Sequence, residues 1–141
     1  EMSASLVGSE MCIRDSFDMV RAVTEKNQKR ALDLYYDLLT LREPPMRILF
    51  LLAKQFRQIC LTKKMSQEGL SQTEIASKLG VPSFVVRNLT SCARSYTVEE
   101  LENAVRDFVD AEEAVKTGTL GDVLSVELLI VKYSSARAVR A

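Results

Sequence analysis

Apolar residues recur at three- and four-residue spacing along most of this chain, and this period constrains the fold more than any other feature. The segment over residues 27–41 shows it in a single stripe, made of Ala31, Leu34, Tyr35, Leu38 and Leu41. Such spacing places side chains on one face of an α-helix. No alternation of apolar and polar residues bounded by turn signals, the mark of a strand, occurs anywhere. The sequence therefore predicts an all-α fold.

Signals for the ends of helices fall between the periodic segments. The pairs Ser71–Glu74 and Thr97–Glu100 have the spacing of a capping box, which marks the first turn of a helix. Gly118 follows a periodic segment, where glycine allows the left-handed residue that ends many helices. With only three prolines and five glycines as further breaks, we expect a compact domain of about six helices.

The segment from Met46 to about Lys64 is the most apolar of the predicted helices. Its apolar residues form one broad face, made of Ile48, Leu49, Leu52, Ala53, Phe56, Ile59 and Cys60. A face of this width indicates a central helix that packs against other helices on more than one side.

The two ends of the chain differ from the periodic middle. Residues 1–16 hold no sustained period, and part of them resembles a translated sequencing-adapter fragment. We expect residues 1–16 to be non-native or disordered, residues 17–133 to form the helical domain, and residues 134–141 to form a C-terminal tail. The longest strongly apolar run is far shorter than the ~20 residues that span a bilayer, and no signal-peptide pattern is present. These features predict a cytoplasmic protein without a membrane contact.

Histidine is absent from the sequence, and this excludes several kinds of catalytic centre. A Ser-His-Asp or Cys-His nucleophile system and a zinc site with imidazole ligands all require that residue. Cys12, Cys60 and Cys92 form no CxxC pair, and the last two lie among apolar residues, so we expect reduced core thiols. No GxxxxGK[ST] loop for nucleotide phosphates occurs either. We therefore expect no catalytic residue, no metal and no cofactor.

The 19 basic and 19 acidic residues are unevenly distributed. Residues 17–64 hold ten basic and five acidic side chains, whereas residues 97–141 hold five basic and nine acidic ones. Zero net charge argues against bulk attraction to nucleic acid or anionic lipid. The uneven distribution fits either contacts between subunits or two solvated helical faces, and the sequence alone leaves both open.

Residues 71–89 have the spacing of a helix-turn-helix, so a DNA-binding regulator over residues 71–96 is an alternative function. In that case Ser83, Arg87 and Asn88 would contact base edges. However, residues 65–96 hold three basic and two acidic side chains, a net charge of +1, which is little for a protein that must neutralise phosphates. This favours a structural helical hairpin.

Several stretches, taken in this order and spacing, resemble one known family. They are FDMVRAV, RALDLYYDLL, ILFLLAKQFRQI, SQTEIASKLGVPSFVVRN, EEAVKTG and LSVELLIVKY. Through them the chain from Phe17 to about Tyr133 is similar to the C-terminal domain of the delta subunit of bacterial DNA polymerase III.

The resemblance implies a part in DNA replication. Delta belongs to the clamp loader, which places the sliding clamp on primed DNA, and its C-terminal helical domain joins delta prime and gamma/tau in a circular collar. A domain of this kind implies a hetero-oligomer that reaches DNA and the clamp only through the full complex. It would have no catalytic activity of its own, because nucleotidyl transfer belongs to the DNA polymerase III holoenzyme.

Candidate interface or structural residues follow from matching motifs and from the last helix. The resemblance covers the family's QFR and KTG segments, which here are Gln55, Phe56, Arg57, Lys116, Thr117 and Gly118. Leu128 and Leu129 belong to a final apolar helix that fits contacts with neighbours. For Phe56 the core is the favoured position, and Gly118 is expected to end its helix.

Overall fold

All regular structure in the computed structural model, which describes residues 17–135, is helical. A helical segment over residues 17–24 precedes six helices, α2 (Gln28–Thr40), α3 (Pro45–Gln67), α4 (Gln72–Leu79), α5 (Ser83–Ala93), α6 (Val98–Lys116) and α7 (Asp122–Ser134). The predicted all-α class is confirmed. The expectation for residues 1–16, and all but the start of the predicted tail, lie outside the described residues.

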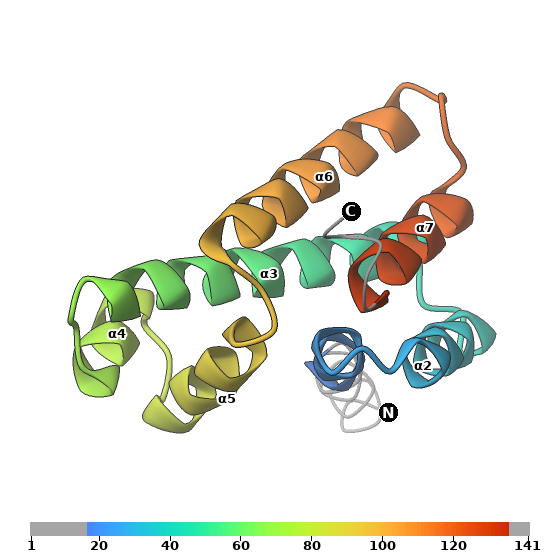
Figure 1. Ribbon diagram of the computed structural model, residues 1–141. Helices are drawn as coiled ribbons and strands as arrows, with labels where there is room; N and C mark the ends of the chain where they lie inside the picture. Colours follow the sequence, from blue (N-terminus) through green and yellow to red (C-terminus); the bar gives the residue numbers. More distant parts are fainter. Residues whose placement is uncertain (1–16, 136–141) are drawn as a thin grey trace, which may run out of the picture.

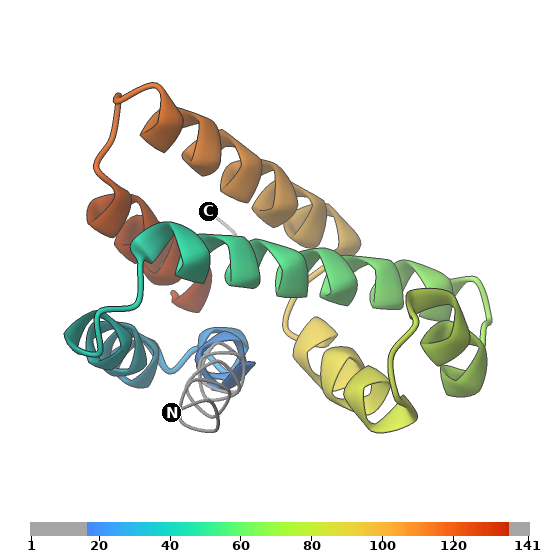
Figure 2. The same cartoon turned by 180° about the vertical axis from the view of Figure 1, so that it is seen from behind.

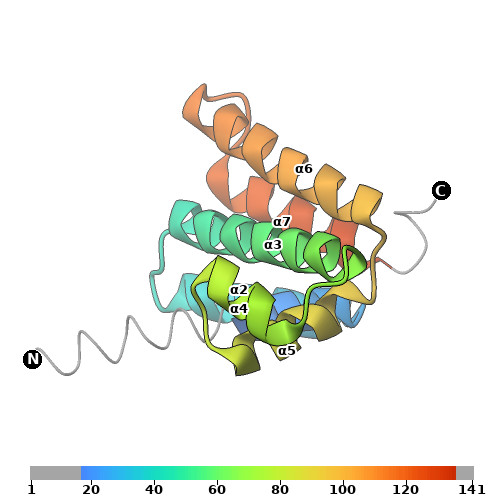
Figure 3. The same cartoon turned by 90° about the vertical axis from the view of Figure 1, so that its left-hand side faces the viewer.

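Helix α3 is the centre of the domain, as its broad apolar face predicted. Figures 1 and 2 show α6 on one side of α3 and α2, α4, α5 and the segment 17–24 on the other, and α7 runs beside the start of α3 from α6 toward α2. Figure 3 shows α3 between α6 above it and α4 and α5 below it. The buried residues of α3 occupy one broad face and are Ile48, Leu49, Leu52, Phe56, Ile59, Cys60 and Thr62. The hydrophobic core therefore lies along this broad face of α3, while the opposite face, which carries Lys54 and Arg57, remains exposed.

An aromatic cluster joins α3 to α6 and α7. The ring of Phe56 lies 5.2 Å from that of Phe108 on α6, 6.0 Å from that of Tyr133 on α7 and 6.1 Å from that of Tyr96. All four side chains are at most 3% exposed. Because tilted aromatic pairs add to the apolar surface that they bury, this cluster fixes the mutual positions of the three helices.

The start of each capped helix agrees with the sequence prediction. Ser71 accepts from the Glu74 backbone N–H at 3.2 Å, and the Glu74 carboxylate accepts from the Ser71 N–H at 2.8 Å. Thr97 and Glu100 make the same reciprocal pair at 3.0 and 2.9 Å at the start of α6. Both capping boxes are confirmed.

Helix α5 is shorter than predicted, because it ends at Ala93 rather than near Tyr96. The Ser95 hydroxyl donates to the Thr24 carbonyl, and the Tyr96 hydroxyl donates to the Tyr133 carbonyl at 2.7 Å. The ammonium of Lys26 donates to that same Tyr133 carbonyl at 3.2 Å and lies over the Tyr96 ring. These long-range bonds hold residues 95–96 in a non-helical conformation and direct the Tyr96 side chain into the core.

Helices α4 and α5 have a small core of their own, separate from the main one. It consists of Ile75, Ala76 and Val86 with partly buried neighbours. Cys60 and Cys92 are buried and free, and desolvation raises the pKa of both thiols. Over residues 17–135, no helix has the length and apolar character needed to cross a lipid bilayer.

Three buried tyrosines donate their hydroxyl protons inside the fold. Tyr35 donates to the Val123 carbonyl at 2.9 Å, Tyr96 to the Tyr133 carbonyl, and Tyr133 to the Asp107 carboxylate. Desolvation is the largest cause that raises the pKa of each hydroxyl, and nearby negative charges raise it further. The fold therefore stabilises the protonated form of all three tyrosines.

Stability is expected to decrease as the pH rises above about 10, the ordinary pKa of tyrosine. Above that pH the unfolded chain loses these protons while the folded chain keeps them, so the unfolded state binds fewer protons and the free energy of unfolding falls. Each tyrosine can lower the free energy of unfolding by at most about 1.4 kcal/mol per pH unit. Urea denaturation between pH 8.5 and 11 measures the slope.

The variant Tyr35→Phe serves as the control for this pH dependence. It lacks one of the three titrating hydroxyls, so its stability should decline less steeply than that of the wild type above pH 10. A slope that is equal in the two proteins would contradict the role assigned to Tyr35.

Candidate subunit-interface surface

The residues of the QFR segment point in different directions from α3. Phe56 is 1% exposed and lies at the centre of the aromatic cluster. Gln55 is half-buried, and Arg57 is exposed. Within residues 17–135, Arg57 makes no hydrogen bond or ion pair. Of the three residues, Arg57 is therefore the one whose polar group is free to meet another molecule.

The KTG segment ends α6. Thr117 is the last residue near helical geometry, and its hydroxyl donates to the Glu113 carbonyl at 3.0 Å. Gly118 has φ +80°, and its N–H donates to the Val115 carbonyl at 3.1 Å, while the next N–H donates to the Ala114 carbonyl at 2.9 Å. This pair of bonds is a Schellman motif. Figures 1, 2 and 3 show this end of α6 diverging from α3, so the structure does not bring the KTG and QFR segments together.

Replacement of Gly118 by alanine is expected to lower the free energy of unfolding by about 1 kcal/mol, because a Cβ disfavours positive φ. Gly121 is a matched control three residues away, with φ −68° and open space around the position of a Cβ. Gly121→Ala should change stability by less than about 0.5 kcal/mol. Urea denaturation compares the two variants, and equal effects would contradict a conformational role for Gly118.

Leu128 and Leu129 are adjacent on α7, but Leu129 is buried and Leu128 is exposed. Leu129 is 8% exposed and belongs to the core, whereas Leu128 is 50% exposed. Leu124 lies one turn before Leu128 on the same helical face and is 48% exposed. We call Leu124 and Leu128 the α7 stripe. It is an apolar surface that residues 17–135 leave exposed.

The predicted helix-turn-helix exists as α4, a turn at Gly80 and α5. Gly80 adopts φ +71° at the end of α4. Ser83 and Arg87 are exposed, while Asn88 is half-buried and its Oδ1 accepts from Arg21 at 3.4 Å. The hairpin thus has a small core of its own and also packs into the main core through Leu89, Cys92 and Ala93 of α5. Only part of the expected base-reading set is exposed.

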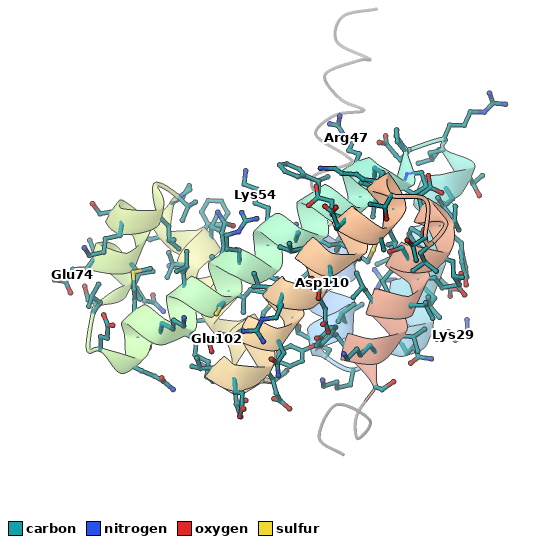
Figure 4. All side chains as sticks on the ribbon, turned by 90° about the horizontal axis from the view of Figure 1, so that it is seen from above. Lys29, Arg47, Lys54, Glu74, Glu102 and Asp110 are labelled. Atoms are coloured by element: carbon teal, nitrogen blue, oxygen red, sulfur yellow. The ribbon has the colours of Figure 1, made fainter. Side chains whose placement is uncertain are left out.

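A groove lies between the antiparallel helices α3 and α6. It has a volume of about 490 Å³ and is lined by Arg57, Cys60, Leu61, Lys64, Glu102, Val105, Arg106 and Val109. Lys64 and Glu102 form an ion pair of 2.6 Å across it, which lowers the pKa of the Glu102 carboxyl. Figure 4 labels Glu102 where the start of α6 approaches α3. The groove combines apolar walls with a charged rim.

Sequence reasoning missed Leu61 and Val109 in this groove. Both are exposed, at 41% and 54%. A signal was present, because Leu61 interrupts the basic side of α3 and Val109 interrupts the acidic side of α6. Among residues 17–135, no group of three or more His, Cys, Asp or Glu side chains is arranged to hold a metal ion.

Comparison with known proteins decides the family. The family described as "DNA polymerase III delta subunit, C-terminal domain" matches residues 14–133. The chain belongs to this family. The predicted resemblance is confirmed, whereas the alternative of a helix-turn-helix regulator gains no support.

Relatives of this delta C-terminal domain agree with the assignment. The DNA polymerase III subunit delta of Bacillus subtilis (strain 168) is 31% identical over 116 residues, which cover 82% of this chain and 33% of that protein. The structure of the Bacillus subtilis DNA clamp loader delta protein matches with a TM-score of 0.82 and 29% identity, over 87% of this chain and 36% of that one. The chain thus spans about a third of the length of the relatives that it matches.

Proposed function

We propose that this delta C-terminal domain is an oligomerisation domain of a bacterial clamp loader. It joins delta prime and gamma/tau in a circular collar and reaches DNA and the sliding clamp only through the full complex. Membership in the delta family supports this proposal, as does the clamp-loader title of the structural relative. The place of action is the bacterial cytoplasm, at the replisome.

The observation that carries the proposal is the α7 stripe. Leu124 and Leu128 remain about half exposed although the domain already has a core that includes their neighbours Leu129 and Ile130. Contiguous apolar patches on a protein surface mark sites that bind another protein, and these two side chains are neighbours on one helical face. Tyr36 of α2 is also exposed and interacts with Glu127 of α7, so the apolar surface has a polar edge.

In this proposal some of the candidate residues contact a neighbouring subunit, and the others stabilise the fold of the domain. Leu128 contacts a neighbouring subunit, and Arg57 faces one from α3. Phe56 and Leu129 maintain the core, and Gln55 lies beside Phe56 on the same helix. Lys116, Thr117 and Gly118 shape the end of α6.

The domain has no catalytic activity in this proposal. The basis is the sequence, which lacks histidine and a phosphate-binding loop. The raised pKa of the buried Cys60 and Cys92 thiols also disfavours the thiolate form that a nucleophile requires. Nucleotidyl transfer belongs to the polymerase that the loader serves.

Size-exclusion chromatography with light scattering tests the proposal. The 141-residue chain is mixed, without nucleotide, with delta prime and gamma/tau from the same genome. We expect one complex that contains all three components, and we expect Leu128→Asp to remain folded by circular dichroism but to leave the complex. A folded wild-type chain that elutes alone would contradict the proposal.

A further inference from the structure

The groove between α3 and α6 is open on the surface and apolar at its centre. Leu61 of α3 and Val109 of α6 line it and are 41% and 54% exposed, and the half-buried Val105 lies one turn before Val109 on α6. Two antiparallel helices with such a seam offer a third helix the space between their side-chain ridges. The volume of about 490 Å³ is enough for several aliphatic side chains.

The same side of α3 continues the surface beyond the groove. Phe50, Lys54, Arg57 and Leu61 follow one another at spacings of four, three and four residues, so they share one helical face. All four are exposed, and Phe50 is 56% exposed. The result is a ridge with apolar side chains at both ends and two positive charges between them.

Those two charges have no partner in the part of the chain that the structure describes. Lys54 and Arg57 make no ion pair or hydrogen bond with any of residues 17–135, whereas Lys64, further along the groove, is paired with Glu102. Figure 4 shows Lys54 projecting outward from α3. An occupant of the groove would therefore meet unpaired positive charge at one end and a closed ion pair at the other.

The groove is separate from the side of α6 that packs on α7. Asp107 of α6 binds Lys132 at 2.7 Å and accepts from the Tyr133 hydroxyl, both on α7. Glu102, Arg106 and Val109 of α6 line the groove instead. A subunit within a ring needs two different surfaces, one for each neighbour, and the α7 stripe and the groove are two separate surfaces of this domain.

We propose that the α3–α6 groove binds an amphipathic helix of a neighbouring clamp-loader subunit, with aliphatic side chains at its centre and carboxylates at the end that meets Lys54 and Arg57. This inference rests on the proposed function and adds a second interface of stated chemistry to it. Aliphatic side chains cover Leu61 and Val109, and the carboxylates pair with Lys54 and Arg57.

Photo-crosslinking in the assembled complex identifies the occupant. A benzophenone amino acid replaces Val109 in the full chain, the complex with delta prime and gamma/tau is irradiated, and the crosslinked peptide is sequenced. We expect a helix of a partner subunit that carries Asp or Glu within two turns of the crosslinked residue. A crosslink to a second copy of this chain, or to a segment without carboxylates, would overturn the inference.

Affinity measurements test the chemistry of the groove. The double variant Leu61→Ser, Val109→Ser and the variant Arg57→Glu should each weaken binding of the partner subunits by roughly tenfold or more. Arg57→Lys keeps the charge and should stay within about threefold of the wild type. Phe84→Ser and Arg87→Glu are matched controls, because both residues are exposed on α5, and they should change the affinity less than twofold.

The outcomes separate this inference from the proposed function. If the wild type does not bind the partner subunits, both fail. A second outcome is that the wild type binds, Leu128→Asp does not bind, and the folded groove variants bind within twofold of the wild type. That outcome overturns the inference about the groove, while the proposed function stands. Circular dichroism of each variant shows that a loss of binding reflects the surface rather than unfolding.

Discussion

Phe56→Ala is expected to lower the free energy of unfolding by about 3–5 kcal/mol. The ring contacts Tyr96, Phe108 and Tyr133, and it is 1% exposed, so its removal leaves a cavity where α3, α6 and α7 meet. The three remaining aromatic side chains are too large to move into that space without losing their own contacts. Urea denaturation followed by circular dichroism measures the change.

The neighbouring residue provides the control for this prediction. Arg57 follows Phe56 on α3 but is exposed and makes no polar contact within residues 17–135, so Arg57→Ala should change stability by less than about 0.5 kcal/mol. A loss below about 1 kcal/mol in Phe56→Ala would show that the aromatic cluster does not hold the helices together.

Leu129→Asp is expected to prevent cooperative folding, while Leu128→Asp is expected to leave stability within about 1 kcal/mol of the wild type. Leu129 is 8% exposed within the main core, so a carboxylate there loses its hydration, at a cost of several kcal/mol. Leu128 is 50% exposed, so a carboxylate at that position remains in water.

Circular dichroism and thermal unfolding distinguish the two positions. Wild-type and variant chains are compared by far-UV circular dichroism and by the sharpness of the thermal transition. Because the two leucines are adjacent on α7, they share the same helix propensity and the same sequence context. Equal destabilisation by both substitutions would mean that Leu128 is also covered in the isolated domain.

Local sequence signals predicted most of the fold. The capping boxes at Ser71 and Thr97 and the glycine stop at Gly118 each depend on a few neighbouring residues, and the structure contains all of them. The central position of α3 followed from the width of its apolar face. Such features are readable because their interactions lie within one or two helical turns.

Features that depend on distant residues were not predictable in this way. The end of α5 at Ala93 depends on bonds from Ser95 to Thr24 and from Tyr96 to Tyr133, which are 71 and 37 residues apart in sequence. The groove likewise exists only because α3 and α6 pack antiparallel. Leu61 and Val109 looked like isolated apolar residues on polar helical faces until the fold placed them across from each other.

The contacts of Tyr133 determine when the core can form during synthesis of the chain. The Tyr133 carbonyl accepts from Lys26, 107 residues earlier, and the Tyr133 ring completes the cluster around Phe56. A ribosome releases the chain from its N-terminal end, so the side of α3 that faces α7 stays open to water until α7 has left the exit tunnel. Among the helices that the structure describes, α7 is synthesised after the others, so it closes this core, and a nascent chain that lacks α7 exposes the apolar surface that α7 would cover.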